Sequence, residues 1–171
     1  LKTIDLKYVD FSSDGVIRLD GTSTKVTLGN LAGSTSLYHK AGTLLNLTFA
    51  DVNTTGNFVL GNVKKLTAQT MVLTGGITAE SLDNMDIKSK DTAAQFDMLI
   101  DADGNNNYIA KTYRLSNNLT GDWTFGDTIT INKIQIDGIA NDFSLLDQDE
   151  TTVKNLMIKG TGESTLDLDL Y

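Results

Sequence analysis

Apolar residues recur through the middle of the chain in pairs that enclose a single residue. The first members, Leu45, Phe58, Met71 and Met85, lie 13, 13 and 14 residues apart, and the second members keep this spacing. Both residues of such a pair face one side of an extended strand, so each pair predicts a short strand with one apolar face. We call these eight residues the apolar stripe: Leu45, Leu47, Phe58, Leu60, Met71, Leu73, Met85 and Ile87.

A second apolar series accompanies the stripe: Phe49, Val63 and Ile77 lie 14 and 14 residues apart. Turns with glycine follow two of the strands, and glycine accepts the positive φ of tight turns. Such a unit cannot bury its apolar face alone and must stack on copies of itself or on other chains. No stretch keeps a 3.6-residue period, so very little helix is expected. The pattern predicts an all-β, elongated, repeat-built fibre, either an intertwined trimeric β-structure or a β-solenoid.

The repeat changes near residue 90, which divides the chain into a repetitive β shaft segment (1–90) and hairpin-bearing β repeats that continue the fibre (91–171). Residues 96–111 contain an apolar strand, a turn rich in Asp, Gly and Asn, and a second strand, which predicts a β-hairpin. Residues 143–159 repeat this order. The apolar positions change from odd to even numbers at residues 132–133, which predicts a bulge or turn there.

Composition and charge narrow the range of functions. The net charge of −8 argues against nucleic-acid binding, which requires a basic face. The chain has no cysteine, so disulfides and thiolate metal sites are excluded. No apolar run reaches the length of a membrane span. The start at Leu1, with no Met and no signal peptide, suggests a processed chain or part of a longer one.

Residues 119–125, followed by 128–131, resemble segments common in bacteriophage tail fibres and related tail adhesins. The segment 99–109 is also similar to fibre segments, although the chain has no proline at its turns and its repeat breaks after residue 88. The resemblance implies a homotrimer in the virion, outside the cell, with the apolar stripe buried between three chains. It implies a structural role without catalysis: spacing and presenting a tip that binds the host receptor. The implied partners are other tail or fibre proteins and a host polysaccharide or protein receptor.

Two other functions fit the same residues. A bacterial surface adhesin would bury the stripe inside a single-chain β-solenoid. A tailspike-like polysaccharide depolymerase would need paired carboxylates across a groove. Candidates for such a pair are Asp101, Asp103, Asp147, Asp149 and Glu150. No phosphate-binding glycine loop, nucleophile elbow or histidine zinc site is present, and no cofactor is expected.

Few residues are candidates for a binding site. Asp101, Asp103 and Asn105 place oxygen ligands at alternate positions, which suits Ca²⁺, but the EF-hand pattern is not met and an Asx-rich hairpin turn is the preferred interpretation. Tyr108 and Trp123 are candidates for stacking on a saccharide, with core packing as the alternative. His39 is the only histidine and is expected at the surface, because no partner for metal binding or catalysis accompanies it.

Overall fold

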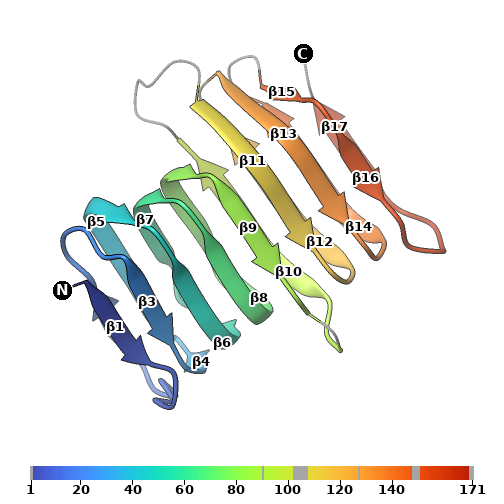
Figure 1. Ribbon diagram of the computed structural model, residues 1–171. Coiled ribbons are helices and arrows are strands. Elements are labelled where there is room, and N and C mark those ends of the chain that lie inside the picture. The colour runs from blue at the N-terminus through green and yellow to red at the C-terminus, as the bar shows by residue number, and fades with distance from the viewer. Residues whose placement is uncertain (1, 90, 102–107, 127, 148–150, 170–171) are drawn as a thin grey trace.

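The computed structural model is a parallel β-solenoid of about seven turns, with 68% strand and no helix. Figure 1 shows the coils stacked side by side along one axis, with the N-terminus at one end and the C-terminus near the other. The structure describes residues 2–89, 91–101, 108–126, 128–147 and 151–169, and these statements concern those ranges. The prediction of an all-β, repeat-built fold is confirmed, and of its two forms the structure is the solenoid.

In the described ranges, seventeen strands form one continuous sheet that winds around the axis. Their bounds are β1 Thr3–Leu6, β2 Val16–Arg18, β3 Lys25–Leu28, β4 Leu31–Gly33, β5 Ser36–Leu44, β6 Leu47–Thr54, β7 Phe58–Val63, β8 Leu66–Leu82, β9 Asn84–Ile87, β10 Ala94–Ile100, β11 Tyr108–Leu115, β12 Leu119–Phe125, β13 Ile129–Ile136, β14 Ala140–Asp147, β15 Thr152–Val153, β16 Leu156–Ile158 and β17 Leu166–Asp169.

Each coil pairs in parallel with the next, so equivalent residues stand above one another. On the face that starts with β1 and β3, Val26, Leu47, Leu66 and Met85 are successive register partners at nearly even intervals. The next partner of Met85 is Tyr113, a longer step along the chain, because the segment between β10 and β11 lengthens this coil. The structural repeat is therefore a coil of roughly 20 residues with one longer member.

The core consists of apolar columns that run along the axis. One column contains Leu37, Phe58, Ile77, Met98 and Trp123, each in register with the next. All five side chains are at most 2% exposed. Burial of each such side chain contributes about 1.5–3 kcal/mol, so the columns supply the main driving force for stacking the coils.

Aromatic side chains fill the wider part of the core in the C-terminal half. The Trp123 ring lies 5.5 Å from the Phe96 ring, 6.0 Å from Tyr113 and 5.1 Å from Phe143, measured between ring centroids. The last two contacts are edge-to-face, the geometry that the ring quadrupole favours. The cluster joins β10, β11, β12 and β14 across the interior of the solenoid.

The apolar stripe lies inside this single chain, and its assignment to an interface between three chains is wrong for seven of the eight residues. Leu47, Phe58, Leu60, Met71, Leu73, Met85 and Ile87 are at most 2% exposed, whereas Leu45 is 40% exposed. The step from one apolar pair to the next covers about two-thirds of a coil, so consecutive pairs lie on different sides of the solenoid. The 13-residue spacing of the pairs is therefore the distance from one side of the solenoid to the next, not the length of the structural repeat.

The two predicted hairpins are also wrong. β10 pairs with β8 and β12, and β11 pairs with β9 and β13, all in parallel, so β10 and β11 belong to different sides of the coil. β14 likewise pairs with β12 and β17 rather than with β16. The sheet continues across residue 90, through the pairing of β8 with β10. The predicted change of the apolar positions from odd to even numbers at residues 132–133 is confirmed. Ile131 and Ile134 are both buried, and the two residues between them form a corner.

The close stacking of coils depends on glycine at one corner. A Cβ atom added to Gly56 would collide with the Thr35 carbonyl, and one added to Gly75 would collide with the Gly56 carbonyl. At the exposed Gly15, an added Cβ would make only an ordinary contact, 3.7 Å from the Ser13 oxygen.

We therefore expect Gly56→Ala to destabilise the protein by about 2 kcal/mol or more, because the backbone of two coils would have to separate. Gly15→Ala is the matched control and should shift stability by no more than about 0.5 kcal/mol. Urea denaturation followed by circular dichroism measures both. Equal midpoints for the two variants would show that the coils are not in this close contact.

The stripe supplies a second matched pair. Leu60→Asp should destabilise the fold by more than about 4 kcal/mol, because it buries an unpaired carboxylate in the core. Leu45→Asp should change stability by no more than about 1 kcal/mol, because that side chain is already partly in water. Thermal melts measure both, and an unchanged melting temperature for Leu60→Asp would contradict the core assignment.

Candidate functional site

The predicted calcium site falls largely outside the described residues, which do not include Asp103 and Asn105. Asp101 is described and exposed, directly after the end of β10. Within the described ranges, no group of three or more His, Asp or Glu side chains is arranged to hold a metal ion. The calcium site therefore stays a prediction.

The two aromatic residues predicted to contact saccharide have different environments. Trp123 is completely buried in the aromatic cluster, so its assignment to a saccharide surface is wrong and core packing explains it. Tyr108 is half-buried, and its hydroxyl donates a hydrogen bond of 2.9 Å to Asp83. Of the two, only Tyr108 remains a candidate for ligand contact.

The expectation that His39 lies at the surface is wrong. Its side chain is completely buried, in the column position between Leu19 and Leu60. Its Nε2 atom lies 2.9 Å from the Gly21 carbonyl oxygen. Because a carbonyl only accepts, Nε2 carries the proton and donates it. The histidine serves to connect two coils inside the core.

Lysine gathers at one corner of the solenoid, where the chain turns onto the face of β1 and β3. In each coil this corner consists of the two residues that directly precede the first buried residue of that face. Val26, Leu47 and Leu66 are examples of such buried residues. Seven of the chain's 14 Lys and Arg residues lie here. We call this corner the lysine ridge; its lysines are Lys2, Lys25, Lys64, Lys65, Lys111, Lys133 and Lys154.

Hydrogen bonds between coils fix the ridge in place. The Thr24 amide donates to the Lys2 carbonyl, the Asn84 amide to that of Lys64, and the Lys154 amide to that of Ile131. Neighbouring coils are about 4.8 Å apart, so ridge lysines on consecutive coils lie well within one Debye length of each other. The ridge is thus a ladder of positive charges along the axis.

Asparagine side chains brace the same corner. The side-chain amides of Asn46, Asn84 and Asn155 each donate to a backbone carbonyl of the preceding coil, at 3.3, 3.2 and 3.1 Å. These bonds keep the corner rigid. Six of the ridge lysines are exposed, and Lys133 is half-exposed. Their ammonium groups are therefore available to a ligand while the backbone beneath them is fixed.

One acidic residue, Asp83, interrupts the described part of the ridge. Its carboxylate lies 3.2 Å from the Lys64 ammonium and accepts the hydrogen bond from Tyr108. Burial, Tyr113 and Asp83 all raise the pKa of Tyr108, and burial followed by Asp83 raises the pKa of Tyr113. Both tyrosines stay neutral at physiological pH and add no negative charge. Among described ridge lysines, only Lys64 forms an ion pair.

A shallow hollow of about 340 Å³ lies beside the ridge, on the outer surface of β9 and β11. Lys65 lines it from the ridge, and Arg114 lines it from the adjoining face. Asn84, Asp86 and Thr112 supply amide, carboxylate and hydroxyl groups between the two cations. The hollow therefore offers both donors and acceptors to a polar ligand.

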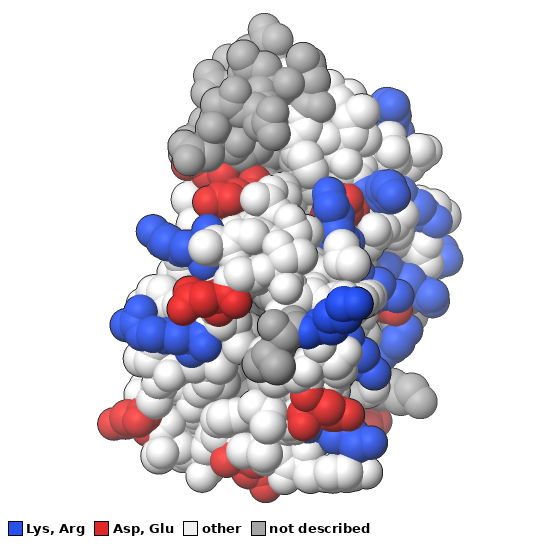
Figure 2. Space-filling view, turned by 60° about the vertical axis from the view of Figure 1, so that its left-hand side comes forward, with Lys and Arg blue, Asp and Glu red and all other residues white. Residues whose placement is uncertain are grey.

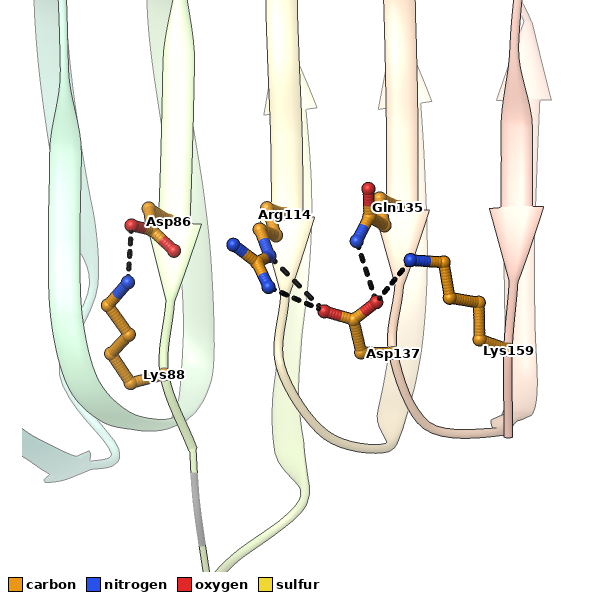
Figure 3. Close-up of polar contacts among 6 residues, drawn as sticks. All are labelled: Asp86, Lys88, Arg114, Gln135, Asp137 and Lys159. Atoms are coloured by element: carbon orange, nitrogen blue, oxygen red, sulfur yellow. Dashed lines mark hydrogen bonds and ion pairs between the residues drawn. The ribbon is translucent and has the colours of Figure 1, made fainter. Parts of the chain in front are cut away.

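A second polar cluster ties three coils together at the opposite end of this face (Figure 3). Asp137 accepts a 2.6 Å hydrogen bond from Gln135, a bond of 2.9 Å from Arg114, and an ion pair of 3.2 Å from Lys159. Arg114 and Lys159 come from the preceding and following coils. The Gln135 bond, with those of Arg114 and Lys159, lowers the pKa of Asp137 to about 2 against partial desolvation.

One pair of acidic residues lies far from the lysine ridge. Asp97 and Asp122 lie about half a coil away from the ridge, where the Asp122 amide donates to the Asp97 carboxylate at 3.0 Å. Figure 2 shows most of the Lys and Arg side chains in view along the right-hand side of the molecule, with a smaller group on the opposite edge. The acidic net charge therefore conceals a local concentration of positive charge.

The ridge was missed in the sequence because its lysines lie at irregular intervals along the chain. A signal was present, however: Lys25, Lys65 and Lys133 each directly precede an apolar i, i+2 pair that starts a strand segment on one face. Aligning these pairs by coil, rather than by a 13-residue spacing, would have aligned the lysines.

No known protein-family model matches this chain, and no curated protein or solved structure is significantly similar to it. In the described part of the chain, no helix is long and apolar enough to cross a membrane.

The Asp137 cluster predicts a dependence of stability on pH. The folded state lowers the pKa of this carboxyl from 3.8 to about 2, so its contribution is present above pH 4 and is lost as the pH falls toward 2. Asp137→Asn should lower stability at pH 7 and flatten the loss of stability between pH 4 and 2. Urea denaturation at several pH values measures this.

Asp167→Asn removes the same charge from an exposed position on β17 and is the control. Its pH profile should follow that of the unmodified protein. If both variants lost the same stability at pH 7, the three-coil cluster would not stabilise the fold.

Proposed function

We propose that this chain is a structural segment of an extracellular appendage, the stem of a bacterial surface adhesin or of a bacteriophage fibre. The observation that carries the proposal is the closed core of a parallel solenoid, in which one chain alone buries its apolar columns. Each added coil extends such a stem by about 4.8 Å without changing its cross-section. Its role is to space and support parts that bind elsewhere.

Both end coils of the described chain present apolar side chains to their surroundings. Leu6 at one end, and Leu166 and Leu168 at the other, occupy inward columns but are 37%, 38% and 45% exposed. Apolar columns and unpaired strand edges favour contact with another β-structure.

Between the two kinds of stem, the buried stripe favours the single-chain adhesin. The resemblance to phage fibres implies a trimer with the stripe between its chains, whereas seven of the eight stripe residues fill the core of one chain. The resemblance of residues 119–131 to phage fibre segments keeps the fibre as the second candidate.

Light scattering on the purified chain at low concentration should give a mass near 18.5 kDa, because the core closes within one chain. The sample should also show the circular dichroism of a β protein. A mass three times larger that persists on dilution would contradict the single-chain stem and favour the trimeric fibre.

A structural segment should also leave polysaccharides intact. Incubation with bacterial capsular polysaccharide or lipopolysaccharide, followed by size-exclusion chromatography, should show an unchanged distribution of chain lengths. Shortening of either polymer would contradict the structural role and favour the depolymerase.

A further inference from the structure

We propose that the lysine ridge and its adjoining hollow bind a linear polysaccharide that carries carboxylate groups, laid along the solenoid axis. This binding surface is additional to the structural role and does not depend on it. The ridge supplies cations aligned along the axis, and the hollow supplies groups that hydrogen-bond to sugar hydroxyls.

The placement of the lysines carries the first step. Like charges on neighbouring strands destabilise a sheet, so seven lysines on one corner are a cost that the fold alone does not require. The net charge of −8 already favours solubility, so solubility does not account for the ridge either. A polyanion lying along the corner would replace repulsion with charge-assisted hydrogen bonds.

The hollow distinguishes a sugar polymer from other polyanions. The Asn84 and Thr112 side chains can accept hydrogen bonds from sugar hydroxyls, whereas the Asp86 carboxylate is already bonded to the Lys88 ammonium at 2.7 Å. A phosphodiester backbone has no such donors and would meet the carboxylates of Asp83 and Asp86. Single-stranded nucleic acid also needs aromatic rings for base stacking. The described ridge positions contain none, and the Tyr108 hydroxyl beside them is already bonded to Asp83.

The ridge also has a gap that can be filled. Leu45 is 40% exposed and stands in register between Thr24 and Lys64, where its amide donates to the Ser23 carbonyl. A lysine at this position would join the ladder without disturbing the core. Leu45→Lys is therefore a variant that should strengthen binding.

Polygalacturonate is the probe, because it is a linear polymer with one carboxylate on each sugar. Binding is measured by isothermal titration calorimetry at low salt, with uncharged dextran as the control polymer. The triple variant Lys65→Gln, Lys111→Gln and Lys133→Gln should bind roughly tenfold more weakly, since each exposed ion pair contributes a factor of up to about five. Leu45→Lys should bind roughly two- to fivefold more tightly for the same reason.

A matched triple variant separates the ridge from net charge. Lys7→Gln, Arg18→Gln and Lys40→Gln remove the same charge away from the ridge and should leave the affinity close to that of the unmodified protein. Circular dichroism checks that every variant is folded. Equal losses in the two triple variants, or no binding of polygalacturonate by the unmodified protein, would overturn the proposal.

The hollow has its own test. Thr112→Val replaces the hydroxyl with a methyl group of the same shape and should weaken polygalacturonate binding about three- to tenfold. It should leave the affinity for inorganic polyphosphate, which has charge but no hydroxyl groups along its chain, unchanged. Binding of polyphosphate or single-stranded DNA as tightly as polygalacturonate would overturn the assignment to a polysaccharide.

Discussion

Parallel hydrogen bonding between consecutive coils is the constraint on which the rest of the structure depends. It places each residue above its equivalent in the preceding coil, about 4.8 Å away, so the environment of one coil position is shared along the whole column. Inward columns must therefore be apolar or internally bonded. Val26, Leu47 and Leu66 meet the first condition, and His39, through its bond to Gly21, meets the second.

The same constraint acts on the outer surface, where it aligns charges. Asp137 shows how the fold uses this alignment, because its carboxylate accepts from cations on the coils before and after it. The lysine ridge shows the opposite arrangement, in which like charges stand above one another. The two corners of this face therefore differ. The Asp137 cluster holds neighbouring coils together, whereas the lysine ridge leaves its ammonium groups exposed to solvent.

In a solenoid of this kind, the buried columns largely determine stability and the outward side chains determine the surface charge. The apolar columns tolerate exchange among large side chains, as Phe58, Ile77 and Met98 show within a single column. The outward positions affect stability less than the buried columns do, so their side chains can vary more widely. A charged edge is compatible with this separation, since a coil that contributes to the ridge does so through only one or two residues.

The sequence by itself determined the class of the fold. Alternating apolar pairs, glycine turns and the absence of helical periodicity require strands that stack on copies of themselves, because these local patterns fix which side of a strand is apolar. They do not fix which strands become neighbours. The 13-residue spacing of Leu47, Leu60 and Leu73 was therefore compatible with an interface between chains as well as with three sides of one solenoid.

Only the tertiary structure decided the coil length, the burial of the stripe and of Trp123, and the alignment of the lysines. Coil length is not constant along the chain. Residues such as Lys65, Lys111 and Lys133 are therefore aligned at one corner only when every intervening segment has folded into its coil. The paths are set by long-range pairing and core packing, which depend on all coils together. The apolar pattern is a local property of the chain, whereas the charged ridge is a property of the register.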